Sequence, residues 1–230
     1  MIKAFICDTR ALDEVSAEKI INETPALAGV ITPKSSVRWL ESAAAYLLLA
    51  SALDQLGYSG ISAIAKDGCG KPHLLSNRGK VPHISISHRP GVALVVICDS
   101  DECGADIERE IDEVRAPGIE KRYLSSMHPI FDKACKCNMS LYVMDRDGNL
   151  SFGEKTTEND YKYLHIEKNF APRSVTERWT LLEAVMKLDG CGVSGMARFD
   201  EIFANVATAH FSLWLDGESY SISVAERVNI

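Results

Sequence analysis

The sequence predicts an α+β fold of two similar halves, in which each half is a helix packed on a small antiparallel sheet. Two segments are predicted to be long helices: 36–56, whose apolar residues recur at helical spacing, and 174–188, which opens with a capping box. Alternating or continuously apolar runs, which favour strands, follow each helix. We therefore place an N-terminal half at residues 1–100 and a C-terminal half at residues 101–230.

The composition limits the class of protein. With 230 residues, of which 46% are hydrophobic, the chain can bury a substantial core. Its formal net charge of −7 argues against a general nucleic-acid or acidic-membrane surface. The sequence has no apolar run of membrane-spanning length and no secretory leader, so we expect a cytoplasmic monomer that binds neither nucleic acid nor membrane. Seven scattered cysteines without a C-x-x-C pair give a structural zinc site little support.

After its helix, the first half is expected to contain a glycine-bearing loop and two strands. The loop over 67–72 is not a Walker loop, because its first glycine is missing and Pro72 stands where Ser or Thr must bind the metal. Residues 83–88 alternate between apolar and polar side chains, which is typical of a strand. Residues 93–98 are continuously apolar, as expected of a strand buried on both faces.

The second half begins with a strand that ends in Asp106 and Glu108. The elements expected after it are a helix over 116–124, a hairpin of 141–144 with 150–152, the helix from Ser174 to about Leu188, and strands at 199–206, 211–215 and 220–225. The turn of the hairpin is not a calcium-binding loop, because Val143 occupies the first ligand position of that pattern.

The most informative stretch is Cys103-Gly104-Ala105-Asp106-Ile107-Glu108. Side chains two apart in a strand point to the same face, so Asp106 and Glu108 stand side by side while Ile107 turns into the core. Two carboxylates this close repel each other, and a hard divalent cation such as Mg²⁺ removes that penalty. The alternative interpretation is an exposed strand end with two solvated acids.

The helix over 174–188 carries a second group of candidate residues. Trp179, Glu183 and Lys187 are four residues apart, so they share one face of the helix. Taken alone, Glu183 and Lys187 are typical of an ordinary surface ion pair beside a half-buried tryptophan.

Side chains that suit an anion occur in the first half. His88 and Arg89 are adjacent donors at a strand end, Lys71 lies in the glycine-bearing loop, and Arg38 lies near the start of the first helix. Each also has an ordinary interpretation, as a satisfied structural histidine or as a solvated lysine or arginine.

In chain order, these features resemble a known family. The motifs are Gly70-Lys71-Pro72, Ser85-Ile86-Ser87-His88, Gly104-Ala105-Asp106-Ile107-Glu108, and the run from Trp179 through Glu183-Ala184 to Lys187 and Gly190. Their order and spacing resemble the 4'-phosphopantetheinyl transferases of the long, pseudo-dimeric type. The resemblance covers about residues 38–108 and 179–230.

The resemblance implies a magnesium-dependent transferase with its active site in the cleft between the halves. The implied reaction moves 4'-phosphopantetheine from coenzyme A to a serine of an apo acyl or peptidyl carrier protein, releasing 3',5'-ADP, as in fatty acid, polyketide or nonribosomal peptide biosynthesis. The implied ligands for Mg²⁺, or Mn²⁺, are Asp106, Glu108 and Glu183. Glu183 is also the implied base, and Lys187 and His88 the implied charge-neutralising catalytic residues. The implied coenzyme A contacts are Arg38, Lys71, Pro72, Ser87, His88, Arg89 and Lys187.

Three features depart from the family pattern. Leu182 stands where the family has a lysine, and Arg89 replaces the small residue that follows the histidine. The stretch from Glu108 to Trp179 is long for the family, which indicates an inserted segment near 125–170. These departures bear on rate and carrier preference more than on reaction class. Two alternatives stay open: a metal-dependent pyrophosphatase acting on coenzyme A or a nucleotide, and a non-catalytic module that binds coenzyme A or a carrier.

Overall fold

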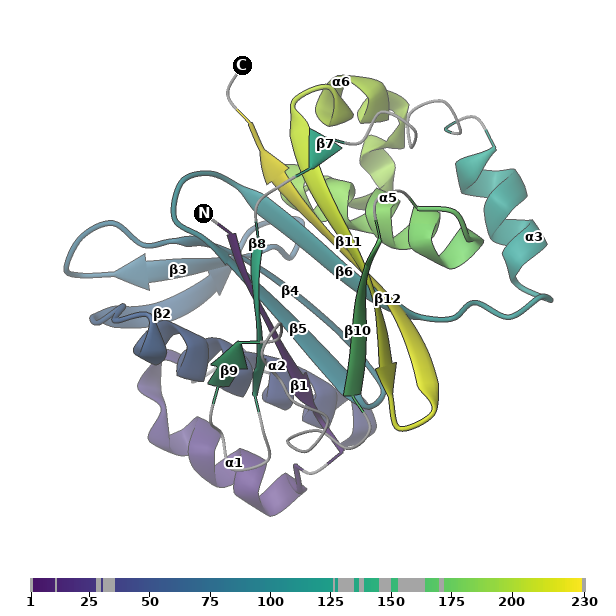
Figure 1. Cartoon of the computed structure of the whole chain (residues 1–230). Helices are drawn as coiled ribbons and strands as arrows, with labels where there is room; N and C mark the ends of the chain where they lie inside the picture. Colours follow the sequence, from purple (N-terminus) through teal and green to yellow (C-terminus); the bar gives the residue numbers. More distant parts are fainter. Residues whose placement is uncertain are drawn as a thin grey trace.

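The computed structural model is that of an α+β protein in which two β-sheets pack against each other and a long helix covers the outer face of each (Figure 1). The residues it describes are 2–10, 12–27, 30, 36–125, 127, 135–136, 139–144, 150–152, 164–169 and 172–228. No helix in these ranges is both long enough and apolar enough to span a lipid bilayer.

The first sheet has the strand order β4-β5-β1-β8-β9. Its strands are β1 (Ile2–Asp8), β4 (His83–Arg89), β5 (Val92–Cys98), β8 (Met139–Met144) and β9 (Leu150–Phe152). Helix α2 (Ser36–Gln55) packs on its outer face, and α1 (Glu14–Glu23) lies against α2. The short turn η1 (Pro25–Leu27) lies against the hairpin of β2 (Ile61–Lys66) with β3 (Pro72–Ser76). The apolar side chains of α2 are therefore buried against one face of the sheet.

The second sheet has the order β10-β11-β12-β6, and β7 also pairs with β11. Its strands are β6 (Cys103–Arg109), β7 (Cys135–Lys136), β10 (Leu164–Asn169), β11 (Val206–Leu215) and β12 (Glu218–Arg227). Helix α5 (Val175–Asp189) packs on β6 and β12, flanked by α3 (Ala116–Ile119), η2 (Glu120–Leu124), η4 (Gly192–Arg198) and α6 (Phe199–Phe203). The order strand, long helix, hairpin thus occurs twice, as β1-α2-β4-β5 and as β6-α5-β11-β12.

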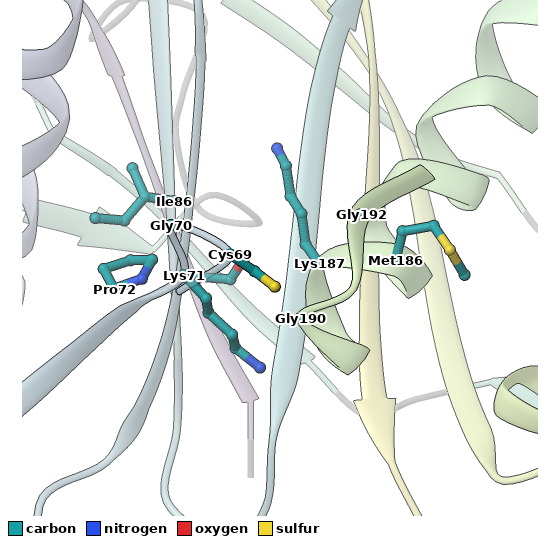
Figure 2. Close-up of a pocket in the computed structure, with 10 residues that line it drawn as sticks. Cys69, Gly70, Lys71, Pro72, Ile86, Met186, Lys187, Gly190 and Gly192 are labelled. Carbon is teal, nitrogen blue, oxygen red and sulfur yellow. The ribbon is translucent and has the colours of Figure 1, made fainter. Parts of the chain in front are cut away.

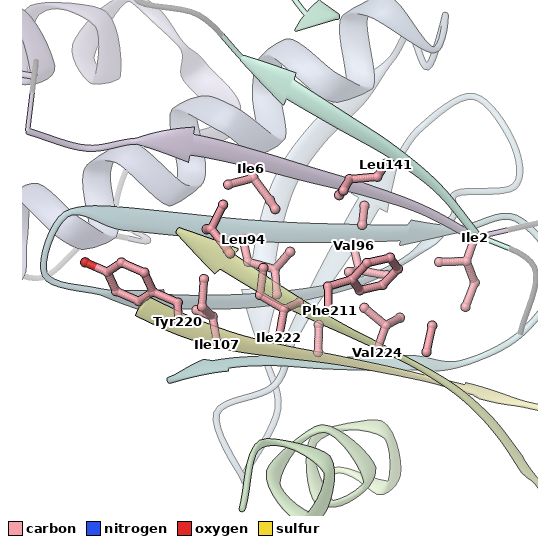
Figure 3. Close-up of a cluster of buried hydrophobic side chains, with 14 of the residues drawn as sticks. Ile2, Ile6, Leu94, Val96, Ile107, Leu141, Phe211, Tyr220, Ile222 and Val224 are labelled. Carbon is pink, nitrogen blue, oxygen red and sulfur yellow. The ribbon is translucent and has the colours of Figure 1, made fainter. Parts of the chain in front are cut away.

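The inner faces of the two sheets form one shared core (Figure 3). Along β6, the residues Cys103, Ala105 and Ile107 belong to this core, whereas Gly104, Asp106 and Glu108 point the other way. Alternation along β1, β5, β11 and β12 supplies most of the remaining apolar side chains, and Leu141 of β8 is a further one. The strands β1, β5 and β6 therefore send one set of side chains into the shared core and present the other set to the covering helix of their sheet.

Serine hydroxyl groups join the two sheets where β4 lies beside β6. The backbone N–H of Ala105 donates to Ser85 Oγ at 2.9 Å, and that of Ile107 donates to Ser87 Oγ at 3.3 Å. These hydroxyls take the place of backbone carbonyls along a free strand edge, whose N–H groups would otherwise be buried without acceptors. The junction brings β4, β6 and α5 together at one place.

Most expected elements are confirmed, including both long helices, the capping box of Ser174 with Glu177, and the hairpin of β8 with β9. The strand expected over 199–206 is wrong, because residues 199–203 form α6 and β11 begins only at Val206. Phe199, Ile202 and Phe203 are spaced three and four apart and pack into the core around α5, which favours a helix over alternation. Strands from the segment near 125–170 extend both sheets: β8 pairs with β1, and β10 and β7 pair with β11.

Candidate functional site

Asp106 lies at the centre of the group of polar side chains where β4, β6 and α5 meet. It is completely buried, and its Oδ1 accepts hydrogen bonds from Ser87 Oγ at 2.7 Å and from Lys187 Nζ at 2.6 Å. Lys187 Nζ also donates to Ser87 Oγ at 3.0 Å, so the three side chains form a closed triangle. The other oxygen, Oδ2, is buried without a hydrogen-bond partner among the described residues. Asp106 is therefore not a solvated acid at an exposed strand end.

Gly104 allows α5 to reach this site. It lies two residues before Asp106, on the same face of β6. A Cβ atom at this position would lie 2.9 Å from Leu188 Cα and still closer to the carbonyl oxygen of Ala184. The helix thus rests directly on the backbone of the strand, and this close approach lets Lys187 reach Asp106.

Glu108, the second carboxylate on this face, is paired with Arg89. Arg89 donates from Nε to Oε1 at 2.9 Å and from Nη2 to Oε2 at 2.6 Å, a two-point contact with both carboxylate oxygens. This contact holds the pKa of Arg89 above its ordinary value. Glu108 is 8% exposed, whereas about one third of the Arg89 side chain is exposed.

Glu183 faces the same group of charges from α5. Its pKa is raised, first by burial and then by the negative charge of Asp106, while Lys187 and Arg89 act in the opposite direction. The alternative interpretation, a surface ion pair of Glu183 with Lys187, does not hold, because Lys187 pairs with Asp106 instead. Within the described parts of the chain, the side chain of Glu183 takes part in no hydrogen bond or ion pair.

His88 points to the opposite face of β4, toward α2. Its Nδ1 lies 3.2 Å from Glu41 Oε2 and its Nε2 lies 3.4 Å from Ser42 Oγ. Burial lowers the pKa of His88, and the nearby cations Lys187 and Arg89 lower it further, whereas Glu41 opposes the shift. The ring lies close enough to Lys187 to feel its charge, yet its hydrogen-bond partners come from the first half.

A cavity of about 200 Å³ lies between the glycine-bearing loop and the end of α5 (Figure 2). Lys71, Pro72 and Lys187 are among its lining residues. Lys71 Nζ donates to the carbonyl oxygen of Leu188 at 2.6 Å and so ties the loop to the last turn of the helix. Arg38 is exposed in the first part of α2 and is not among the described residues that line this cavity.

The carboxylates of this site meet some of the requirements for binding a divalent cation, but not all of them. Within the described ranges, no three His, Cys, Asp or Glu side chains are grouped closely enough to hold a metal ion. Asp106 Oδ2 nevertheless is a buried oxygen without a partner there, and Glu183 is crowded by the charge of Asp106. A cation would relieve both conditions. Glu108 would have to share its oxygens with Arg89.

Two residues of this region, Glu41 and Ser42, belong to none of the sequence motifs. Ser85 and the closely packed Gly104 lie within motifs, but the sequence assigned neither of them a role. Glu41 and His88 are 47 residues apart, and no local pattern links them. Leu182, which stands at the position of the absent lysine, is fully buried in the core around α5.

Comparison with known proteins leaves the geometry as the basis for interpretation. No protein-family model matches the chain, and no curated protein matches it either.

Proposed function

We propose that this protein is a 4'-phosphopantetheinyl transferase, which transfers the phosphopantetheine group of coenzyme A to a serine of an apo acyl or peptidyl carrier protein. The observation that carries the proposal is the triangle of Ser87, Asp106 and Lys187 at the junction of β4, β6 and α5. Each of its members belongs to a motif on which the family resemblance rests. The repeated order of strand, long helix and hairpin supports a pseudo-dimeric fold of the same family.

The side chains have the charges that phosphoryl transfer requires. Lys187 and Arg89 are the cations nearest to the carboxylates, and they would stabilise negative charge on the pyrophosphate. Glu183, whose pKa is raised, suits a base that accepts the proton of the carrier serine. The cavity beside Lys71 and Pro72 would receive the nucleotide end of coenzyme A.

Asp106 and Glu183, with Glu108 as a third ligand once Arg89 turns toward phosphate, would hold Mg²⁺. Mg²⁺ held by these residues would offset the negative charge that develops on the phosphate groups. Lys187 would keep the Asp106 carboxylate oriented, because it binds only one of its two oxygens.

One observation favours a different function, a non-catalytic module that binds coenzyme A. Arg89 occupies both oxygens of Glu108 and so competes with a metal ion for them. Turnover distinguishes the two functions: a module of this kind binds coenzyme A and leaves the carrier unmodified.

The test is mass spectrometry of an apo carrier protein after incubation with the protein, coenzyme A and Mg²⁺. We expect the carrier to gain the mass of one phosphopantetheine group, and we expect Asp106→Ala to abolish this gain. Free phosphopantetheine with an unmodified carrier would indicate a pyrophosphatase instead. An unmodified carrier without any cleavage of coenzyme A would contradict both enzymatic functions.

Arg89→Ser tests the competing arrangement at Glu108. We expect weaker binding of coenzyme A, because a phosphate-binding cation is lost. Faster turnover that requires less Mg²⁺ would instead identify Arg89 as a competitor of the metal and remove it from the coenzyme A contacts. Arg109→Ser is a suitable control, because Arg109 follows Glu108 at the end of β6 and pairs with Glu218 at the surface.

A further inference from the structure

His88 is held by two neighbouring residues of α2, and this contact has a functional consequence. A carboxylate can only accept a hydrogen bond, so Glu41 Oε2 requires a proton on His88 Nδ1. In the neutral ring, Nε2 is then an acceptor, and it faces the hydroxyl group of Ser42. Glu41 is buried, whereas the His88 side chain is 30% exposed and so is accessible to a ligand.

The charges around His88 come from three elements. Glu41 faces it from α2, Lys187 from α5 and Arg89 from β4 itself. The two cations disfavour a proton on Nε2 in the absence of a ligand. A ligand with several phosphate groups would neutralise both cations at once, and the ring could then become a third cation without repulsion.

We propose that Glu41 is a positioning residue, and that it orients His88 so that Nε2 takes up a proton as the phosphate groups of coenzyme A bind. In the same step, the Ser42 hydroxyl group no longer donates to Nε2, and it becomes available as a donor to the phosphate. This inference rests on the proposed function for the identity of the ligand. It adds to that function a proton linked to binding and two residues, Glu41 and Ser42, that neither the motifs nor the resemblance includes.

The lowered pKa of His88 agrees with this arrangement. The free protein holds the ring neutral near pH 7, so proton uptake on binding is possible there. Glu41 raises the pKa of His88, and loss of its charge would make the proton harder to acquire.

The experiment is calorimetric titration of the intact protein with coenzyme A near pH 7, in buffers of different ionisation enthalpy. The dependence of the observed heat on the buffer gives the number of protons taken up per coenzyme A. We expect net uptake by the wild-type protein and none by His88→Gln. We expect Glu41→Gln to reduce the uptake and to weaken binding by about tenfold, as for the loss of one charge-assisted hydrogen bond.

Asp54→Asn is the matched control, because Asp54 is an exposed acid on the same helix. It should leave both uptake and affinity unchanged. Wild-type uptake and affinity in Glu41→Gln would overturn the proposal while the proposed function stands. Failure of the wild-type protein to bind coenzyme A would overturn both.

A second measurement needs only the folded wild-type protein. Nitrogen chemical shifts of the His88 ring, assigned by the loss of its signals in His88→Gln, report which nitrogen carries the proton. We expect the Nδ1–H tautomer in the free protein and the doubly protonated ring in the presence of coenzyme A. A ring protonated at Nε2 alone in the free protein would contradict the role of Glu41.

Discussion

The charges at the junction of β4, β6 and α5 are arranged in unequal pairs. Asp106 pairs with Lys187 and Glu108 pairs with Arg89, whereas the partly buried Glu183 forms no ion pair among the described residues, and burial and the charge of Asp106 raise its pKa. Because Asp106 is fully buried, its partner is a structural requirement as well as a candidate catalytic group. The residues of the site are therefore expected to influence stability and activity together.

Lys187→Met should destabilise the protein by about 3 kcal/mol, the low end of the range for breaking a buried ion pair, because one third of the Lys187 side chain is exposed. The loss arises because Asp106 keeps its charge in a buried place without a cation. Urea unfolding measures it. Adding Asp106→Asn in the same chain should recover most of the stability, since the uncompensated charge is then gone. A Lys187→Met protein as stable as the wild type would contradict the pairing.

Glu183→Gln should stabilise the protein at pH 7 and have little effect below about pH 4. The folded-state pKa of this carboxyl group is raised above its ordinary value of 4.5, so the folded state binds more protons than the unfolded state between the two values. Stability is therefore lost as the pH rises through that interval, and the uncharged variant avoids the loss. Thermal unfolding at both pH values measures the difference. Glu201→Gln, a change at an exposed acid of α6, should show no such dependence.

At the scale of elements, the contact of α5 with β6 determines the geometry of the site. Gly104 sets the distance between helix and strand, and the capping box of Ser174 with Glu177 together with Gly190 in the left-handed conformation define where the helix begins and ends. Lys187 lies in the last turn of the helix. A small displacement of α5 would therefore separate Lys187 from Asp106.

Gly104→Ala should cost about 3 kcal/mol of stability, because the added Cβ collides with the backbone of α5 rather than with a flexible side chain. It should also lower the affinity for coenzyme A, since α5 must move away from β6. Urea unfolding and calorimetry measure the two effects. Gly118→Ala is the control: apart from its chain neighbours and the backbone of its own helix, no atom of the described residues lies within 4 Å of its added Cβ, and alanine in α3 should be neutral or stabilising by up to about 1 kcal/mol. Equal stability of the two variants would mean that α5 does not rest on Gly104.

At the scale of the whole molecule, the two sheets share one apolar core and are joined by serine hydroxyls. The core draws on β1 and β5 from the first sheet and on β6, β11 and β12 from the second. Tyr220 adds a further link, because its hydroxyl group donates to the carbonyl oxygen of Pro90 at 2.9 Å. Neither sheet can bury its inner face without the other, so we expect the two halves to unfold together.

Single-tryptophan variants test this expectation. One variant keeps Trp39 on α2, the other keeps Trp179 on α5, and phenylalanine replaces the other tryptophans in each. Fluorescence transitions in urea should coincide with the transition followed by circular dichroism within each variant. A Trp39 signal lost at lower urea than the remaining secondary structure would show that the first half unfolds separately.

Local rules were enough to predict much of this protein from its sequence. Alternation placed Asp106 and Glu108 on one face of β6 and Ile107 on the other, as the structure has them. Helical spacing and the capping box predicted α2 and α5 nearly to their ends. These features depend on residues a few positions apart, so the chain itself contains the information. The sequence did not predict β1, α1 or the β2–β3 hairpin.

The choice of partners depended on the tertiary structure. Lys187 lies four residues from Glu183 but pairs with Asp106, which is 81 residues away along the chain. His88 is held by Glu41, and Leu182 points into the core. Residues 199–203 form a helix because their apolar side chains pack into the core around α5. Periodicity determines which face of an element a side chain occupies. Which charged group the side chain contacts on that face depends on how closely another element packs there. In this site, the close approach of α5 to Gly104 sets that distance.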